Sequence, residues 1–167
     1  ILNIKTRKME IITADLWDEY TEDLVLLNID LKQYGKKDNF AGKVETLKIY
    51  EDNSYIRKML GENGKGKVLV IDGGGSNRCA LIGDNIAKLA IDNQWEGVVV
   101  YGCIRDSKEI NKMNIGIKAV GTCPVKSIKR NVGIAGEELI IQGTKVNNDQ
   151  YIYVDMDGIL LSNRKLV

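Results

Sequence analysis

Two aspartates and an arginine, at a fixed spacing, are the residues of this sequence best suited to carry chemistry. Asp84 is followed, after twenty intervening residues, by the pair Arg105-Asp106. Arginine presents a planar fork of donors that matches a carboxylate or an enolate. Aspartate supplies the hard oxygen ligands that Mg²⁺ and Mn²⁺ prefer. If the three side chains meet, they form a small site for an anionic oxo-acid and a divalent metal.

The elements around these residues read as strand, helix and strand. Residues 68–71 are apolar and mostly β-branched, and the glycine-rich 72–75 follow them, which predicts a buried strand ending in a tight loop. The apolar members of 86–90 recur at helical spacing, with 84–85 where an N-cap would stand. A second buried strand is predicted at 98–101.

This order predicts that the three residues converge. Two parallel strands joined by a helix require a crossover, so the start of the helix and the end of the second strand lie at one edge of the sheet. Asp84 and the pair Arg105-Asp106 then face each other there, where open parallel sheets bind ligands. The first turn of the helix adds free N–H groups and a partial positive charge, which suit a carboxylate or phosphate.

Each of the three residues also has a purely structural interpretation. Asp84 can cap its helix, Asp106 can cap the next helix in a capping box with Glu109, and Arg105 can be an ordinary surface residue. The residue types alone leave both interpretations open, and the predicted convergence is what favours a site.

Three other motifs are better explained without a ligand. The Asp72–Gly75 stretch lacks the lysine of a P-loop and the third glycine of a dinucleotide fingerprint, so its glycines are predicted to allow close backbone approach. Asp155–Gly158 has too few ligands for a calcium loop and is predicted to be a turn. The basic trio Lys126, Lys129 and Arg130 is interpreted as a solvated face.

Length and charge limit the classes of function. The chain has 167 residues, of which 44% are hydrophobic and 28% charged, which is ordinary for one globular domain. A net charge of +1 gives no electrostatic case for direct binding to nucleic acid or to an anionic membrane. Residues 1–8 are interpreted as an extension or tag remnant, and 9–167 as the single domain.

Cysteine and histidine counts narrow the chemistry further. Three cysteines without CxxC spacing favour reduced thiols and a cytoplasmic protein. The absence of histidine removes Ser-His-Asp and Cys-His catalysis and the usual zinc ligand sets. Acid–base chemistry would therefore use carboxylates, lysine, tyrosine or metal-bound water.

The rest of the chain predicts an α/β domain with more than one sheet. A helix with Thr13 as its N-cap is expected at the start, and Leu24–Leu31 is left open between helix end and strand. A loop is expected at Gln33–Asn39 and a strand at Phe40–Tyr50, before a helix capped by Asn53-Ser54. Further strands, antiparallel near the end, are expected at 115–120, 139–142, 151–154 and 159–161.

The same residues carry a family resemblance. The stretches GKVLVIDGGGSNRCALIGDNIAKLA and NQWEGVVVYGCIRD resemble the family that joins the regulators of ribonuclease E activity A to the class II 4-hydroxy-4-methyl-2-oxoglutarate / 4-carboxy-4-hydroxy-2-oxoadipate aldolases. The similarity runs from about Thr13 to Leu161, and its specific part is the complete motif formed by Asp84, twenty residues and Arg105-Asp106.

The resemblance implies a fold, an assembly and roles for residues. The fold is a single compact α/β/β domain of the swivelling type, with a parallel central unit and a second antiparallel sheet, in a homotrimer or a dimer of trimers. Gly83, Asp84, Asn85 and Ile86 would hold the pyruvate moiety, and Arg105 would bind the keto-acid and steady the enolate. Asp106 would anchor Mg²⁺ or Mn²⁺. An acid from the neighbouring subunit, which the sequence does not identify, would complete the site.

Two functions follow from the resemblance. The first is a metal-dependent aldolase that releases pyruvate from 4-hydroxy-4-methyl-2-oxoglutarate and decarboxylates oxaloacetate as a side activity, with Arg105 and Asp84 as catalytic residues. The alternative is a protein-binding regulator that lowers the activity of ribonuclease E. The complete motif favours the aldolase, because a binding surface has no need of a carboxylate beside an arginine.

Overall fold

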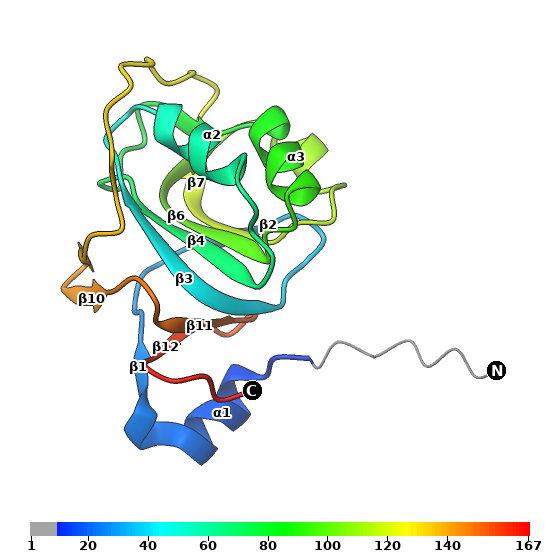
Figure 1. Cartoon of the computed structure of the whole chain (residues 1–167). Coiled ribbons are helices and arrows are strands. Elements are labelled where there is room, and N and C mark those ends of the chain that lie inside the picture. Colours follow the sequence, from blue (N-terminus) through cyan, green and yellow to red (C-terminus); the bar gives the residue numbers. More distant parts are fainter. Residues whose placement is uncertain (1–9) are drawn as a thin grey trace.

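The computed structural model describes residues 10–167, so the predicted extension at residues 1–8 lies outside the described residues (Figure 1). The helices are α1 (Thr13–Tyr20), a 3-10 turn η1 (Thr21–Asp23), α2 (Ser54–Leu60), α3 (Asp84–Asp92) and α4 (Ser107–Ile110). The strands are β1 (Leu24–Leu26), β2 (Lys32–Tyr34), β3 (Phe40–Lys48), β4 (Lys67–Asp72), β5 (Ala80–Ile82), β6 (Gly97–Ile104), β7 (Ile117–Thr122), β8 (Ile134–Ala135), β9 (Leu139–Ile141), β10 (Thr144–Val146), β11 (Tyr151–Val154) and β12 (Ile159–Ser162). Within residues 10–167, no helix is long and apolar enough to span a membrane.

One large mixed sheet dominates the molecule. Its order is β1-β12-β11-β3-β4-β6-β7-β2, with β5 paired to β6 and β8 to β3. The strands β3, β4, β6 and β7 are mutually parallel, and β5 pairs with β6 in parallel, whereas the flanking strands are antiparallel. The predicted α/β class with a parallel centre is therefore confirmed. The antiparallel strands β11 and β12 extend the main sheet, and the separate antiparallel sheet is the β9–β10 hairpin.

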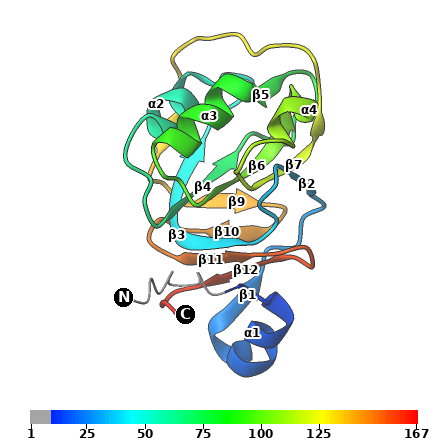
Figure 2. The ribbon, with the colours of Figure 1, turned by 90° about the vertical axis from the view of Figure 1, so that its right-hand side faces the viewer.

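Both faces of the parallel strands are covered, which explains their unbroken apolar runs. In β4, Leu69 and Ile71 face a cluster that includes α2 and α3, while Val68 and Val70 face a second cluster that includes the β9–β10 hairpin. Figure 1 shows α2 and α3 over one face of the sheet, and Figure 2 shows the hairpin on the other. A strand buried on both faces does not alternate apolar and polar residues. The two central strands were predicted for this reason, and the helix between them from its helical spacing of apolar residues.

The first helix packs at the far end of the sheet, beside β1, β11 and β12 (Figure 2). The prediction that Thr13 is its N-cap was wrong, because the helix begins at Thr13 and Ile12 is the N-cap. Both the backbone N–H and the hydroxyl of Thr13 donate to the Asp155 carboxylate, each at 2.7 Å. Asp155 also accepts N–H groups of its own turn, 155–158, so the turn prediction is confirmed.

Several short elements differ from expectation. The open stretch Leu24–Leu31 contributes the edge strand β1, and the predicted loop Gln33–Asn39 overlaps β2. Two three-residue strands, β5 and β10, were not predicted. Segments of three residues carry too little periodicity to be recognised, and their strand geometry depends on a partner distant in the sequence.

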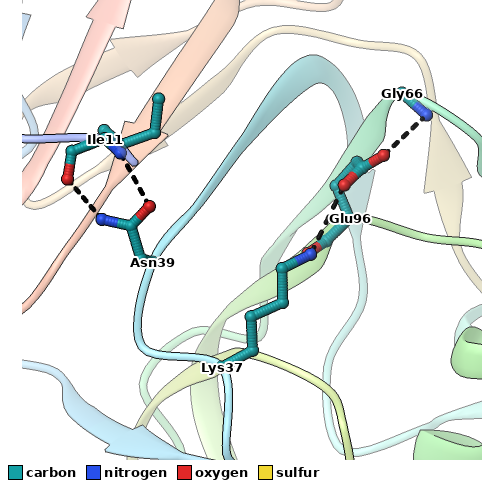
Figure 3. A network of polar contacts seen from close by, with 5 residues as sticks. All are labelled: Ile11, Lys37, Asn39, Gly66 and Glu96. Carbon is teal, nitrogen blue, oxygen red and sulfur yellow. Dashed lines mark hydrogen bonds and ion pairs between the residues drawn. The ribbon is translucent and has the colours of Figure 1, made fainter. Parts of the chain in front are cut away.

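Polar contacts fix the segment that leads into β3 (Figure 3). The Asn39 side chain accepts the Ile11 N–H at 2.8 Å and donates to the Ile11 carbonyl. Lys37 reaches the backbone oxygen of Glu96 at 2.8 Å, and the Glu96 carboxylate accepts the Gly66 N–H at 3.3 Å. These contacts join the N-terminal segment to the starts of β3, β4 and β6.

Candidate active site

The predicted convergence at the edge of the sheet occurs. The backbone N–H of Asp84, the first residue of α3, donates to Oδ2 of Asp106 at 3.0 Å. The neighbouring Arg105 is held by its own N–H, which donates to the carbonyl of Ile82 at 2.9 Å. Figure 2 places β5, α3 and α4 at the same end of the molecule. The topology therefore brings residues from the end of β6 against the start of α3.

The capping interpretation was wrong for Asp84, and for Asp106 it was right in position but not in the hydrogen bond. The N-cap of α3 is Gly83, and Asp84 and Asn85 lie inside the helix. Asp106 stands at the N-cap position of α4, but its side chain makes no capping hydrogen bond there. Its carboxylate turns instead toward α3, and its backbone is left-handed, with φ 56° and ψ 36°. Aspartate is one of the few non-glycine residues that adopt this conformation with little strain.

Gly83 allows this close approach. A Cβ atom at this position would stand 2.8 Å from Oδ2 of Asp106 and 3.5 Å from Nε of Arg105. Any side chain would push the carboxylate away from the start of α3. The glycine is thus required by contact with the site rather than by its own backbone angles.

A cleft of about 660 Å³ opens around these residues, a size typical of ligand sites. Its walls come from the start of α2, the start of α3, the end of β6 and the segment after β7, and consist of Asn53, Arg57, Ala80, Gly83, Asp84, Asn85, Ile86, Arg105, Asp106 and residues 125–129. All six residues predicted to bind substrate or metal are therefore in one cleft. The wall formed by 125–129 was not predicted.

Two N–H groups at the start of α3 are already engaged by carboxylates. Asp84 N–H donates to Asp106, and Asn85 N–H donates to Oδ1 of Asp84 at 2.8 Å. A negative group at this helix end is stabilised by the N–H groups and by the helix dipole. The start of α3 therefore stabilises negative charge, at present that of the chain's own carboxylates.

Another wall belongs to a segment that we call the 125–132 strap, which arches past α2 (Figure 1). Its anchor is Asp52, which is 2% exposed. Oδ2 of Asp52 accepts the N–H groups of Arg130 at 2.9 Å and Val132 at 3.1 Å. Oδ1 accepts the N–H and the hydroxyl of Ser54, at 2.9 and 2.6 Å, at the start of α2. One buried carboxylate therefore ties the strap to a helix.

Further hydrogen bonds hold the strap nearer the cleft. The Ala80 N–H donates to the Val125 carbonyl at 2.7 Å, and the Asn53 N–H donates to the Ser127 hydroxyl at 3.3 Å. Sequence reasoning assigned Asn53-Ser54 only a capping role. The Asn53 side chain makes no capping bond, and it donates instead to the Leu81 carbonyl at 3.2 Å.

Two residues of the basic trio, Lys126 and Lys129, line the cleft. Lys126 and Lys129 are exposed, as expected of a solvated face, but they also line the cleft, whereas Arg130 does not. The cleft contains four cationic side chains, the two lysines with Arg57 and Arg105, against the carboxylates of two aspartates. The excess of positive charge favours an anionic ligand.

Comparison with known proteins places the chain in a family. The family model described as RraA-like, Aldolase/RraA, matches residues 13–161. The chain belongs to the RraA-like family. A Dechloromonas aromatica protein named "Putative 4-hydroxy-4-methyl-2-oxoglutarate aldolase" is 49% identical, over 92% of this chain and 97% of that protein.

Two solved structures share the fold over nearly the whole chain. One is titled as the RNA-processing inhibitor RraA from Thermus thermophilis, with a TM-score of 0.91 and 41% identity, over 95% of this chain and 96% of that one. The other is titled as an S-adenosylmethionine:2-dimethylmenaquinone methyltransferase from Geobacillus kaustophilus. It also has a TM-score of 0.91 and 41% identity, over 93% of this chain and 97% of that one. The resemblance inferred from the sequence is confirmed.

The glycine-rich loop of this RraA-like chain lies close against Tyr101 of β6, which is the close approach predicted for its glycines. A Cβ atom on Gly73 would lie 2.7 Å from the Tyr101 carbonyl, and one on Gly75 would lie 2.7 Å from the Tyr101 ring. The N–H groups of both glycines donate to the Tyr101 carbonyl at 3.0 Å. Close backbone approach accounts for these glycines without a nucleotide.

The cysteines lack the features of a nucleophile. Cys79, Cys103 and Cys123 are free and buried. Burial raises the pKa of Cys79 and Cys103, which keeps both as neutral thiols. Among residues 10–167, no group of three or more His, Cys, Asp or Glu side chains is arranged to hold a metal. A cation at Asp106 would therefore need water, substrate or another chain for its remaining ligands.

Proposed function

We propose that this RraA-like chain is a divalent-metal-dependent lyase that cleaves 4-hydroxy-4-methyl-2-oxoglutarate to two molecules of pyruvate. The main support is the hydrogen bond from Asp84 N–H to Asp106, which brings a helix N-terminus and a carboxylate together in a cleft that also contains Arg105. The names of relatives at 49% and 46% identity agree with this reaction.

Arg105 is assigned to the substrate's 1-carboxylate and 2-oxo group. The half-buried guanidinium lies beside the start of α3, so fork and helix end can hold one planar oxo-acid from two sides. Cleavage removes the proton of the 4-hydroxyl and breaks the C3–C4 bond. The products are pyruvate and a pyruvate enolate, and Arg105 stabilises the developing negative charge.

Asp106 is the residue assigned to hold the metal. Its carboxylate is exposed to the cleft, and one oxygen is oriented by the Asp84 N–H while the other remains available to a cation. Magnesium sites commonly use one or two carboxylates, with water and substrate as the other ligands, and this donor set fits that pattern. A bound divalent cation supplies Lewis acidity at the 2-oxo group.

Proton transfer is assigned to the Asp84 carboxylate and water. Asp84 and Asp106 are the two carboxylates in the cleft wall, and Asp84 is the one not assigned to metal. Protonation of the enolate at C3 gives the second pyruvate. Loss of CO₂ from oxaloacetate leaves the same enolate, so oxaloacetate decarboxylation is expected as a side activity. No lysine Schiff base is needed.

The proposal includes an oligomer. A homotrimer or a dimer of trimers would set the cleft against a neighbouring subunit, which would contribute an acidic residue to the metal or the 4-hydroxyl. Analytical ultracentrifugation tests this part, and a monomer with full activity would contradict it.

The decisive experiment measures pyruvate release from 4-hydroxy-4-methyl-2-oxoglutarate and from oxaloacetate, with Mg²⁺, with Mn²⁺ and with chelator. Wild type, Arg105→Ala and Asp106→Ala are compared with Asp18→Asn, an exposed control on α1. Loss of a charge-stabilising group costs on the order of 10²–10³ in rate. The two site variants should therefore lose nearly all turnover while keeping the melting temperature of the wild type. Wild-type rates in either variant would refute the residue assignment.

The alternative function is regulation of a ribonuclease E-type endonuclease. It is favoured by the likeness to the structure titled as an RNA-processing inhibitor. It predicts a stoichiometric complex with the endonuclease and a reduced cleavage rate, both unaffected by Asp106→Ala. Co-sedimentation of the purified proteins tests it, and failure to form a complex at micromolar concentrations would count against it.

A further inference from the structure

The wall of the cleft formed by the 125–132 strap carries positive charge that the proposed reaction does not use. Lys126 and Lys129 stand on the 125–132 strap and line the cleft, with Arg57 nearby on α2. Within residues 10–167, no carboxylate forms an ion pair with these three side chains or with Arg105. Positive charge is therefore available on two separate walls of the same cleft.

The strap is fixed at several points, so its lysines are presented from a defined backbone. The Val125 carbonyl accepts the Ala80 N–H, and the buried Ser127 hydroxyl accepts the Asn53 N–H. The Ile128 N–H donates to the Glu51 carbonyl at 3.3 Å. The first of these contacts immediately precedes Lys126, and the other two lie between Lys126 and Lys129. A backbone held in this way lowers the ordering cost of binding.

The two cationic walls suit a ligand with two negative ends. One carboxylate at Arg105 and the start of α3 accounts for the first wall and leaves the lysines without a partner. We propose that Lys126 and Lys129 form the subsite for the second carboxylate of a dicarboxylic 2-oxo acid, and so determine specificity for dicarboxylic over monocarboxylic substrates. The inference rests on the proposed function, because it takes the Arg105 end of the cleft as the site of the oxo-acid.

The position of the third basic residue of the strap provides a matched control. Arg130 has the same charge and stands one residue from Lys129, but it does not line the cleft. Only its backbone N–H serves the anchor at Asp52, so Arg130→Gln leaves that hydrogen bond in place. A general electrostatic effect of the strap would respond equally to Arg130 and to the lysines. A local subsite responds only to the lysines.

The test measures binding rather than turnover. Isothermal titration with Mg²⁺ present compares 2-oxoglutarate with 2-oxopentanoate, which have the same chain length and differ in the second carboxylate. Neither has a 4-hydroxyl group, so neither undergoes the cleavage. The proteins are wild type, Lys126→Gln, Lys129→Gln, the double variant and Arg130→Gln, each checked for folding by circular dichroism.

Wild type should bind 2-oxoglutarate about tenfold more tightly than 2-oxopentanoate, as expected for two solvent-accessible charge pairs. Each single variant should lose about threefold of this preference and the double variant nearly all of it, while Arg130→Gln keeps it. Affinity for 2-oxopentanoate should stay constant throughout.

Three results would overturn the subsite. They are equal binding of the two acids by wild type, a preference that survives in the double variant, and an equal loss in Arg130→Gln. If wild type bound neither acid, this would refute the subsite in the same way as equal binding of the two acids. Failure of the proposed reaction looks different: wild type would prefer 2-oxoglutarate, yet release no pyruvate from 4-hydroxy-4-methyl-2-oxoglutarate.

Discussion

The anchor of the 125–132 strap gives the most quantitative prediction. Asp52 is 2% exposed and accepts four hydrogen bonds, two from Ser54 and one each from the backbones of Arg130 and Val132. Asp52→Asn has nearly the same shape but carries no charge, and its NH₂ group cannot accept. Donors on one side of the side chain therefore lose their partner.

The expected loss of stability is about 3 kcal/mol. A hydrogen bond to a charged group contributes about 1.5–3 kcal/mol, and a donor left unsatisfied costs about 1–3 kcal/mol. The variant keeps one acceptor oxygen, so the total stays near the cost of one or two such bonds. For a domain of this size, 1 kcal/mol corresponds to about 2–4 °C in Tm. The melting temperature should fall by about 6–12 °C.

The effect should depend on pH with a definite sign. Burial alone would raise the pKa of Asp52, but the hydrogen bonds from Ser54, Val132 and Arg130 outweigh it and lower the pKa below its usual value. The stabilisation is then present above the unfolded pKa of about 3.9 and is lost as pH falls through the folded value. The difference between wild type and Asp52→Asn should shrink between about pH 5 and pH 3.

Urea unfolding followed by tryptophan fluorescence at pH 7, 5 and 3 measures this difference. Asp18→Asn, an exposed substitution on α1, is the control and should stay within about 0.5 kcal/mol of wild type. A variant at Asp52 as stable as this control, or a difference that does not change with pH, would refute the assignment of Asp52 as the anchor. Because the strap presents the lysines, Asp52→Asn should also weaken binding of 2-oxoglutarate more than binding of 2-oxopentanoate.

Three further substitutions test other contacts. Gly83→Ala places a Cβ atom 2.8 Å from Oδ2 of Asp106. The value of kcat should fall at least tenfold, and the free energy of unfolding should fall by about 1 kcal/mol. Unchanged steady-state rates would contradict the contact. Arg105→Lys keeps the charge but loses the fork, so kcat/KM for pyruvate release should fall about 10² with Tm unchanged, and a fall in Tm instead would indicate a structural role. Asp155→Asn weakens the tether to Thr13 and should cost about 2 kcal/mol at neutral pH. Burial alone would raise the pKa of Asp155, but its hydrogen bonds lower it. In urea unfolding this cost should therefore begin to diminish below about pH 4, and a cost as large at pH 3 as at pH 7 would argue against the tether.

The centre of the fold could be predicted because one physical rule governs it. Residues 68–71 and 98–101 are continuous apolar runs because both faces of their strands are covered. Once these strands are parallel, the topology places Asp84 beside Arg105-Asp106 whatever the loops do. The central part of the site therefore followed from local patterns and chain topology.

The other half of the site could not be predicted in this way. The bonds from Asp52 reach Arg130 and Val132, 78 and 80 residues further along the chain. The strap is irregular, so no periodicity marks it, and a buried aspartate looks in the sequence like any helix cap. The sequence indicated only that Lys126 and Lys129 lie on a solvated face. Both are exposed, but they also line the cleft, and a sequence pattern does not distinguish these two cases. The starts of α1 and α3 were misplaced by about one residue, whereas the cap of α2 at Asn53 was predicted correctly.

The left-handed backbone of Asp106 has an evolutionary consequence. Besides aspartate, asparagine and glycine adopt this conformation at little cost. Both have codons one nucleotide away from those of aspartate. A lineage can therefore discard the carboxylate in a single mutational step with the fold intact, and can recover it as easily. The carboxylate proposed to hold the metal is therefore separable from the fold, so paralogues with and without it can arise repeatedly from one ancestor.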